Sequence, residues 1–263
     1  MKKKKETIMQ HPIIVIGMGE LGSVFARGCL KLGYPVQGVR RQDSLQQMAQ
    51  AIPNPRAVIV AVGEADLHSV MQNFPAAWAH DVVLLQNELL PRDWQASQIP
   101  RPTVISVWFE KKPGMDTKVV VPSPVYGKHS KLIFDALATL DIPVVQLDSA
   151  EELLFELVRK NVYILTTNIA GLEVGGTVRT LAEEHPALMK SVASDVLDIQ
   201  DWLTDNDNDR DQLTDGMLAS FEGDPEHKCM GRSAPARLKR ALSFADEAGL
   251  AVPQLRKIAQ AHL

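Results

Sequence analysis

The chain has 263 residues, of which 45% are hydrophobic and 23% charged, and its formal net charge is −4 at pH 7. This length suits one large domain or two smaller ones, and the composition is that of an ordinary globular protein. The negative balance argues against a nucleic-acid partner, for which a basic face is expected, and the absence of a long apolar run argues against a membrane span.

The start of the chain and its cysteines bear on the cellular compartment. The first residues are basic but lack the apolar segment of a secretory signal peptide. Cys29 and Cys229 form neither a metal-binding pattern nor a C-x-x-C pair. Together these features predict a protein of the reducing cytoplasm, without a metal site.

A glycine-rich turn organises the first half of the chain. The β-branched run Ile13–Ile16 is typical of a strand that is buried on both faces, and apolar residues at helical spacing follow the turn. The turn itself is a G-x-G-x-x-G motif made of Gly17, Met18, Gly19, Glu20, Leu21 and Gly22. In this context the first glycine permits a tight turn, the second lets the backbone approach a pyrophosphate, and the third lets the helix pack closely. We therefore predict that these six residues bind a dinucleotide at the helix N-terminus; the alternative is a glycine-rich turn without a ligand.

The residues after the second predicted strand indicate which dinucleotide is bound. An NAD-binding fold has an acidic residue at the end of this strand, here Pro35–Val39, to hold the ribose hydroxyls. This chain has Arg40 and Arg41 instead, and arginine suits the 2′-phosphate of NADP. The prediction is NADP(H), the alternative being two solvated arginines; Asp43 is predicted to cap the next helix.

Further strands alternate with helices up to about residue 148. The predicted strands are Ala57–Val62, Val82–Leu85, Thr103–Val107, Lys118–Val121 and Pro143–Val145. This alternation predicts a Rossmann-type, doubly wound parallel sheet, in which ligands bind beyond the carboxyl ends of the strands. Val62 ends one of these strands and Asn87 follows another, and both are predicted cofactor contacts. The Asn87 amide could also bond the substrate, although it is equally typical of a turn residue.

From residue 149 onward the pattern is helical only. The sequence therefore predicts two domains, residues 1–148 for the dinucleotide and residues 149–263 as an all-α helical bundle for substrate and dimerisation. Lys160 and Asn168 lie on one stripe of the first helix, two turns apart, where one substrate could touch both. The alternative for Lys160 is a solvated helix lysine.

These features resemble the ketopantoate reductases, over nearly the whole chain. The resemblance rests on the glycine turn, Arg40-Arg41, Gln86-Asn87, Lys160 with Asn168, and Ala241–Pro253. The family reduces 2-dehydropantoate to pantoate with NADPH, using a dinucleotide domain and a helical domain. The resemblance implies that Lys160 is the catalytic lysine, that Asn168 and Asn87 bind substrate, and that Arg40 or Arg41 meets the 2′-phosphate.

The chain also departs from the family pattern, as a divergent member would. Ile164 stands where the family has a first helix asparagine, Arg232-Ser233 where it has a Thr-Glu pair, and Gly216 where it has a serine. Arg232 and Arg237 could instead hold a substrate carboxylate bidentately. The sequence therefore predicts an NADPH-dependent reductase of a small 2-oxo acid or related carbonyl. The alternative is an NADP-binding sensor or regulatory protein without turnover.

Overall fold

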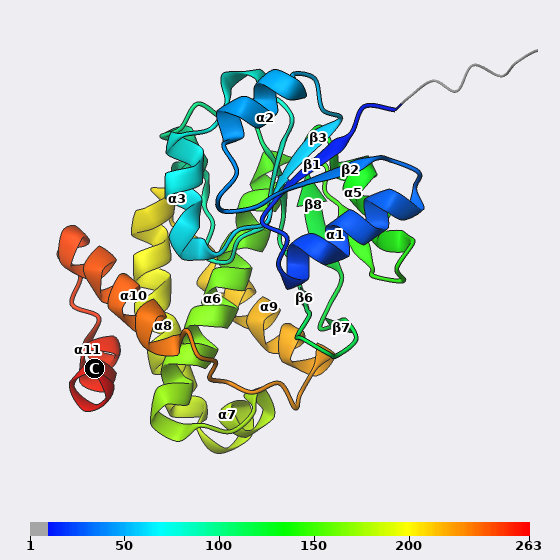
Figure 1. Cartoon of the computed structure of the whole chain (residues 1–263). Coiled ribbons are helices and arrows are strands. Elements are labelled where there is room, and N and C mark those ends of the chain that lie inside the picture. Colours follow the sequence, from blue (N-terminus) through cyan, green and yellow to red (C-terminus); the bar gives the residue numbers. More distant parts are fainter. Residues whose placement is uncertain (1–9) are drawn as a thin grey trace, which may run out of the picture. The chain divides into compact units, whose positions relative to one another are not determined.

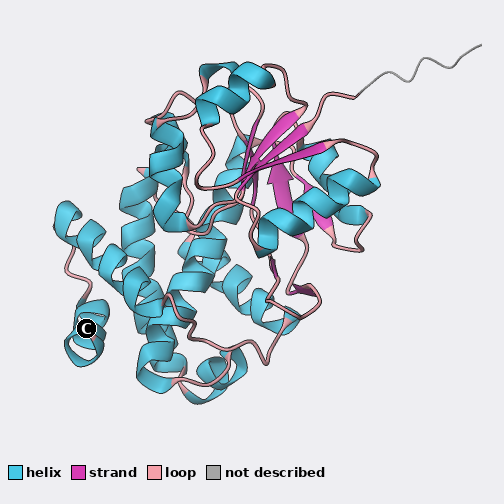
Figure 2. Ribbon diagram, viewed as in Figure 1, coloured by secondary structure: helices cyan, strands magenta, loops and turns pink. Residues whose placement is uncertain are grey.

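The computed structural model describes residues 10–263, which divide into two compact units. The first, called here the sheet unit, contains the described residues up to Gln86 and the segment Asp93–Ala150. The second, the helical unit, contains Glu151–Leu263 and also the short segment Asn87–Arg92. Figure 2 shows strands in the first unit and helices alone in the second.

The sheet unit is built on seven strands in the order β2-β1-β3-β4-β5-β8-β9. Their bounds are β1 Ile13–Ile16, β2 Val36–Val39, β3 Ala57–Val60, β4 Val82–Leu84, β5 Thr103–Ile105, β8 Ser123–Tyr126 and β9 Val144–Gln146. All neighbours are parallel except β5 and β8. The order reverses at β1, which lies between β2 and β3, so ligands are expected beyond the carboxyl ends of these strands.

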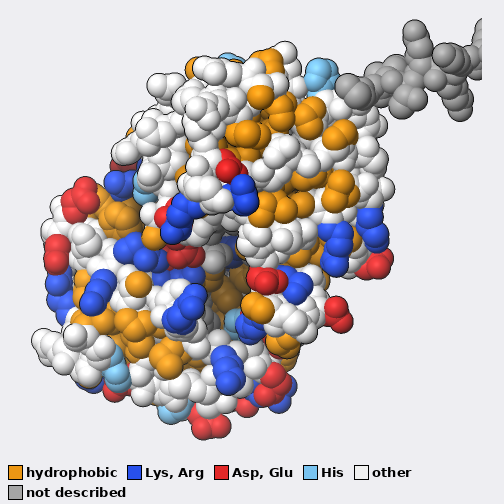
Figure 3. All heavy atoms as spheres, in the orientation of Figure 1, with side chains coloured by type: hydrophobic (Ala, Val, Ile, Leu, Met, Phe, Trp, Pro, Cys, Tyr) orange, Lys and Arg blue, Asp and Glu red, His pale blue; other side chains and the backbone are white. Residues whose placement is uncertain are grey.

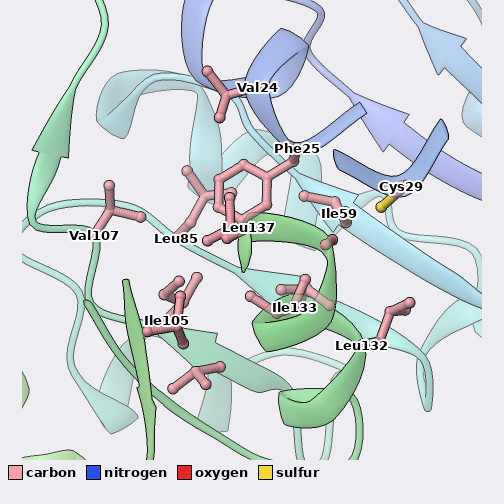
Figure 4. Packing of buried hydrophobic residues seen from close by; sticks show 14 of the residues in the cluster. Val24, Phe25, Cys29, Ile59, Leu85, Ile105, Val107, Leu132, Ile133 and Leu137 are labelled. Atoms are coloured by element: carbon pink, nitrogen blue, oxygen red, sulfur yellow. The ribbon is translucent and has the colours of Figure 1, made fainter. Parts of the chain in front are cut away.

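Helices cover both faces of this sheet (Figure 1). They are α1 Glu20–Lys31, α2 Leu45–Ala51, α3 Glu64–Gln72 and α5 Ser130–Ala138. A 3₁₀ turn at Ala76–Trp78 and the short helix α4 at Pro91–Gln95 complete the helices of this part of the chain. On one face α1 and α5 enclose a core that includes Phe25, Ile59 and Ile133, seen from close by in Figure 4. The two helices approach so closely that a Cβ at Gly28 would lie 2.5 Å from the Ala136 carbonyl oxygen.

The predicted fold class is confirmed, with local differences. Lys118–Val119 forms β7, which pairs with β6 (Phe109–Glu110) in a separate two-stranded sheet. The strand β8 was not predicted, because Pro124 interrupts a run that has little apolar alternation. The predicted cap of α2 was also wrong: Ser44 caps this helix by accepting from the Gln47 N–H, while Asp43 turns back to the Arg40 N–H.

The helical unit has six helices among the described residues. They are α6 Ala150–Val174, α7 Val178–Glu184, α8 Pro186–Thr204, α9 Arg210–Gly223, α10 Ala234–Ala248 and α11 Pro253–His262. Most of the long helix α6 is buried, including polar residues such as Lys160 and Asn168. Within the part of the chain that the structure describes, no helix is both long and apolar enough to cross a membrane.

Candidate functional site

The glycine turn between β1 and α1 has the backbone that the motif predicts. Gly17 adopts a φ of +91°, and a Cβ there would lie 2.8 Å from the Ala61 carbonyl oxygen. A Cβ at Gly22 would lie 2.0 Å from the Gly17 carbonyl oxygen. By contrast, a Cβ at Gly19 would meet no atom within 4 Å. Two glycines are therefore required by the fold of the turn, whereas Gly19 leaves open space at the helix N-terminus, where a phosphate can approach.

A cavity of about 660 Å³ adjoins this turn at the point where the strand order reverses. Its walls come from the ends of β1, β2 and β3 and from one stripe of α3. The lining includes Gly17, Gly19, Arg40, Arg41, Asp43, Val62, Asp66, Ser69 and Asn73. Polar side chains from the segment after β2 and from α3 and its C-terminal end thus converge on one hollow beside the open glycine, as expected for the adenosine end of a dinucleotide.

Arg40 and Arg41 lie at this cavity, and each is paired with a carboxylate. The Arg41 guanidinium donates to Asp66 at 2.5 Å, while Arg40 contacts Asp43 at 3.4 Å. A hydrogen bond from the Arg40 backbone N–H, reinforced by its side chain, lowers the pKa of Asp43. The arginine side chains remain 68% and 85% exposed, so both guanidiniums are accessible to an incoming anion.

The remaining predicted cofactor residues surround the same turn. The Met18 side chain lies over Gly38 of β2, and Leu21 packs against the core. Glu20 begins α1 and forms an ion pair with Lys111 at 3.2 Å. The Val62 carbonyl oxygen accepts a hydrogen bond of 3.2 Å from Gln86, which fixes the end of β3 at the cavity. The open position at Gly19 and the polar lining of the cavity fit a dinucleotide.

In the helical unit, α6 carries the residues predicted for substrate and catalysis. Lys160 is 5% exposed and Ile164 is also buried. One residue earlier, Arg159 donates to Glu156 and to Ser220 of α9. A Cβ at Gly216 would lie 2.8 Å from the Arg159 Cδ. The glycine that replaces the expected serine thus leaves room for the arginine to cross α9.

A charged cluster joins α6, α10 and the segment after β4. The Asn168 amide donates to the Cys229 carbonyl oxygen at 3.1 Å and accepts from Arg237 at 2.8 Å. Arg237 also donates to Glu88 at 2.9 Å, and Glu88 in turn accepts from Arg240 at 2.6 Å. The structure therefore brings together two residues that the sequence predicted for substrate, Asn168 and Arg237.

Other predicted residues lie near this cluster or apart from it. Asn87, directly before Glu88, is half-buried and belongs to the helical unit. Arg232 is exposed before the start of α10 and forms none of the hydrogen bonds or ion pairs found among the described residues. In the same loop His227 lies 3.4 Å from the buried Asp224. Among residues 10–263 no group of His, Cys, Asp and Glu side chains could hold a metal ion.

Sequence reasoning missed several polar residues of these two regions. Asp66 and Ser69 line the cavity from α3, and Asn73 lines it from the C-cap of this helix; their spacing of three and four residues is a helical stripe that could have been recognised. Glu88 and Arg240 were missed because their contact joins residues 152 positions apart. No local pattern indicates such a pair.

Comparisons with known proteins identify the fold. No family model matches the sequence, and no curated protein matches it. Among solved structures, a 2-dehydropantoate 2-reductase from Methylococcus capsulatus matches with a TM-score of 0.68 at 13% identity, covering 95% of each chain. A dimeric ketopantoate reductase from Staphylococcus aureus matches with a TM-score of 0.65 at 16% identity, covering 95% of this chain and 96% of the other.

A third structure extends the comparison to another activity. D-mandelate dehydrogenase, in a ternary structure with NADH and anilino(oxo)acetate, matches with a TM-score of 0.65 at 13% identity, covering 94% of this chain and 96% of the other. The chain thus has the ketopantoate reductase fold over almost its entire length, at low sequence identity.

Proposed function

We propose that this chain, which has the fold of the ketopantoate reductases, is an NADPH-dependent oxidoreductase that reduces the carbonyl group of a small 2-oxo acid. The observation that carries this proposal is the cavity beside the open Gly19, at the reversal point of the strand order. Its shape and donors fit a dinucleotide. The activities of two structurally similar proteins, a 2-dehydropantoate 2-reductase and a D-mandelate dehydrogenase in complex with NADH and anilino(oxo)acetate, support the substrate class.

NADP(H) is the cofactor that we propose, rather than NAD(H). The support comes from Arg40 and Arg41, two accessible guanidiniums at the cavity. A guanidinium binds phosphate through charge-assisted hydrogen bonds, each worth about 1.5–3 kcal/mol before screening by salt. Replacing both arginines with alanine should therefore lower the ratio of NADPH affinity to NADH affinity, mainly because NADPH binds more weakly.

The residues of the helical unit supply positioning and a proton in this proposal. A bound nicotinamide supplies the hydride when the carbonyl is reduced. Lys160 polarises the carbonyl oxygen and donates the proton that this oxygen acquires. Asn87 and Asn168 position the substrate, and Arg237, with Arg232 at the neighbouring loop, attracts its carboxylate. We also propose a homodimer through the helical unit and a cytoplasmic location; the dimeric Staphylococcus aureus reductase supports the dimer.

A screen of NADPH oxidation across small 2-oxo acids tests the proposed function. We expect at least one acid to be reduced, which is seen as NADPH oxidation that does not occur when the acid is omitted. The second candidate function is an NADP-binding sensor without turnover, which the buried Ile164 and the replacement of the expected glutamate by Ser233 favour. Tight NADPH binding without turnover across the screen would establish this second function in place of the first.

A further inference from the structure

A lysine of the β6–β7 hairpin contacts the first residue of α1, directly beside the glycine turn. The Lys111 ammonium lies 3.2 Å from the Glu20 carboxylate and donates to the Lys112 carbonyl oxygen at 2.8 Å. Glu20 follows Gly19, which lines the cavity and has open space at its Cβ position. Figure 3 shows acidic and basic side chains side by side where Figure 1 draws the start of α1 and β6. The hairpin therefore brings a cation to the end of α1 at which a dinucleotide pyrophosphate is expected.

The hairpin is anchored on α1, so the core of the sheet unit sets the position of this lysine. Phe109 of β6 is buried, and its ring centre lies 6.2 Å from that of the buried Phe25 of α1. Phe109 also pairs with Val119 of β7. Lys111 lies only two residues beyond Phe109, and its side chain is 20% exposed. Its ammonium is thus held near the glycine turn before any ligand binds, which reduces the entropy lost on binding.

The ion pair of Lys111 and Glu20 is suited to exchange for a bound anion. Glu20 begins α1, and the positive end of the helix dipole stabilises its carboxylate there. No side chain caps the N-terminus of α1, so its first N–H groups can donate to an anionic ligand. A pyrophosphate bound to these N–H groups is attracted by Lys111 and repelled by the Glu20 carboxylate. The two side chains therefore act on the same ligand with opposite sign.

We infer that Lys111 is a pyrophosphate-binding residue of the cofactor site, and that Glu20 holds its ammonium at the glycine turn until a dinucleotide displaces the carboxylate. The inference rests on the proposed function only in requiring a dinucleotide at this turn. It adds a contact that acts on NADPH and NADH alike, because both carry the pyrophosphate. Arg40 and Arg41, by contrast, are proposed to act on the 2′-phosphate of NADPH. All four residues belong to the sheet unit.

Calorimetric titrations of the full chain test this role without requiring turnover. Lys111→Gln should weaken the binding of NADPH, NADH and ADP-ribose by about tenfold each, the effect of one charge-assisted hydrogen bond at a partly exposed site. Adenosine 2′-monophosphate lacks the pyrophosphate, so its affinity should stay that of the wild type. Lys111→Arg should retain most of the dinucleotide affinity, because it keeps the charge. Lys112→Gln is the matched control, since it removes the next cation of the hairpin, which pairs with Glu110.

Glu20→Gln distinguishes ligand binding from a purely structural ion pair. It breaks the same pair but removes the repelling carboxylate, so the binding of NADPH and NADH should tighten by about two- to fivefold. If the pair only held the hairpin in place, Glu20→Gln and Lys111→Gln would change the cofactor affinity in the same direction. That result would overturn the inference. Unchanged NADPH binding in Lys111→Gln, or an equal loss in Lys112→Gln, would also overturn it.

Failure of the proposed function gives a different set of results. If the wild type binds NADPH but reduces no 2-oxo acid, the reductase function fails, and the titrations of the Lys111 and Glu20 variants still decide the inference. If the wild type binds neither NADPH, NADH nor ADP-ribose, the inference is overturned together with the cofactor assignment. If the wild type reduces an acid and Lys111→Gln binds NADPH equally well, the inference alone is wrong.

Discussion

The Asp66 carboxylate accepts a hydrogen bond of 2.5 Å from the Nη2 of Arg41, and both residues line the same cavity. A 2′-phosphate that binds Arg41 must therefore compete with a carboxylate of the protein itself. The exposed fractions of these side chains, 85% for Arg41 and 48% for Asp66, place the pair in the class of surface ion pairs, which contribute up to about 1 kcal/mol.

Removing this competitor should favour the phosphorylated cofactor. We expect Asp66→Asn to tighten NADPH binding by about two- to fivefold and to leave NADH nearly unchanged. Calorimetric titration of each cofactor at low salt measures both effects. Asp135→Asn is the control, since it neutralises another carboxylate in an exposed pair, with Lys131 of α5. If Asp135→Asn tightened NADPH binding equally, the effect would come from the net charge of the protein and not from competition at Arg41.

Two alanine substitutions in the glycine turn should have opposite effects. Gly22→Ala should destabilise the fold by several kcal/mol, because its Cβ would lie 2.0 Å from a backbone oxygen. Gly19→Ala should leave the melting temperature within a few degrees of the wild type. It should nevertheless lower the affinity for NADPH by at least about tenfold, because the added Cβ enters the space for the phosphates.

Thermal unfolding and cofactor titration together check this pair of predictions. Gly231→Ala is the control, because its Cβ also meets no atom within 4 Å but lies outside the cavity. If Gly19→Ala binds NADPH as the wild type does, the turn is not the phosphate site.

Lys160 is predicted to matter for turnover and not for the cofactor. Lys160→Ala should lower kcat by about 10²–10⁴, the usual effect of removing a general acid, with the NADPH affinity retained. Because the side chain is 5% exposed, Lys160→Met provides a second variant that preserves packing. Lys190→Ala, at an exposed position of α8, is the control. Wild-type turnover in both Lys160 variants would refute the assignment.

The stability of the sheet unit should depend on pH through His129. Its side chain is 1% exposed, and burial lowers its pKa although a contact of 3.0 Å with Asp81 partly opposes this. The unfolded chain therefore takes up the proton first as the pH falls below about 6.5. Stability should decrease with falling pH in this window, by up to about 1.4 kcal/mol per pH unit for one proton.

Urea unfolding of the wild type and two variants between pH 7.5 and 5 measures this slope. His129→Gln should flatten it, even if the variant is less stable at every pH. His80→Gln removes an exposed histidine and should keep the slope of the wild type. The explanation is wrong if the slope survives in His129→Gln.

The parts of the fold that were predicted from sequence have signals confined to a few adjacent residues. Ile13–Ile16, the glycine turn and α1 follow one another directly, and each has its own pattern. The strand β8 was missed because it contains a proline and has no clear strand pattern of its own. Its extended structure depends on pairing with β5. The propensity of such a segment is overridden by its tertiary neighbours.

The same distinction applies to the candidate site. Arg40 and Arg41 could be related to the cavity because their position after a strand is a local feature. The contact between Arg237 and Glu88 could not be predicted from the sequence, because the two residues are 149 positions apart. Glu88 also adopts a positive φ, which a glutamate seldom has. The sequence identified the arginine, whereas the contact that orients it depends on the tertiary fold.

The assignment of Asn87–Arg92 to the helical unit has a consequence for dissecting the protein. The chain leaves the sheet unit after Gln86, returns at Asp93 and leaves again after Ala150, so neither unit is one continuous stretch. A fragment ending near residue 148 would carry Glu88 away from both of its arginines, and would also remove Arg92 from the rings of Trp202 and Phe244. Separate expression of the two halves should therefore give a poorly folded C-terminal piece, which the N-terminal piece could restore only by complementation in trans.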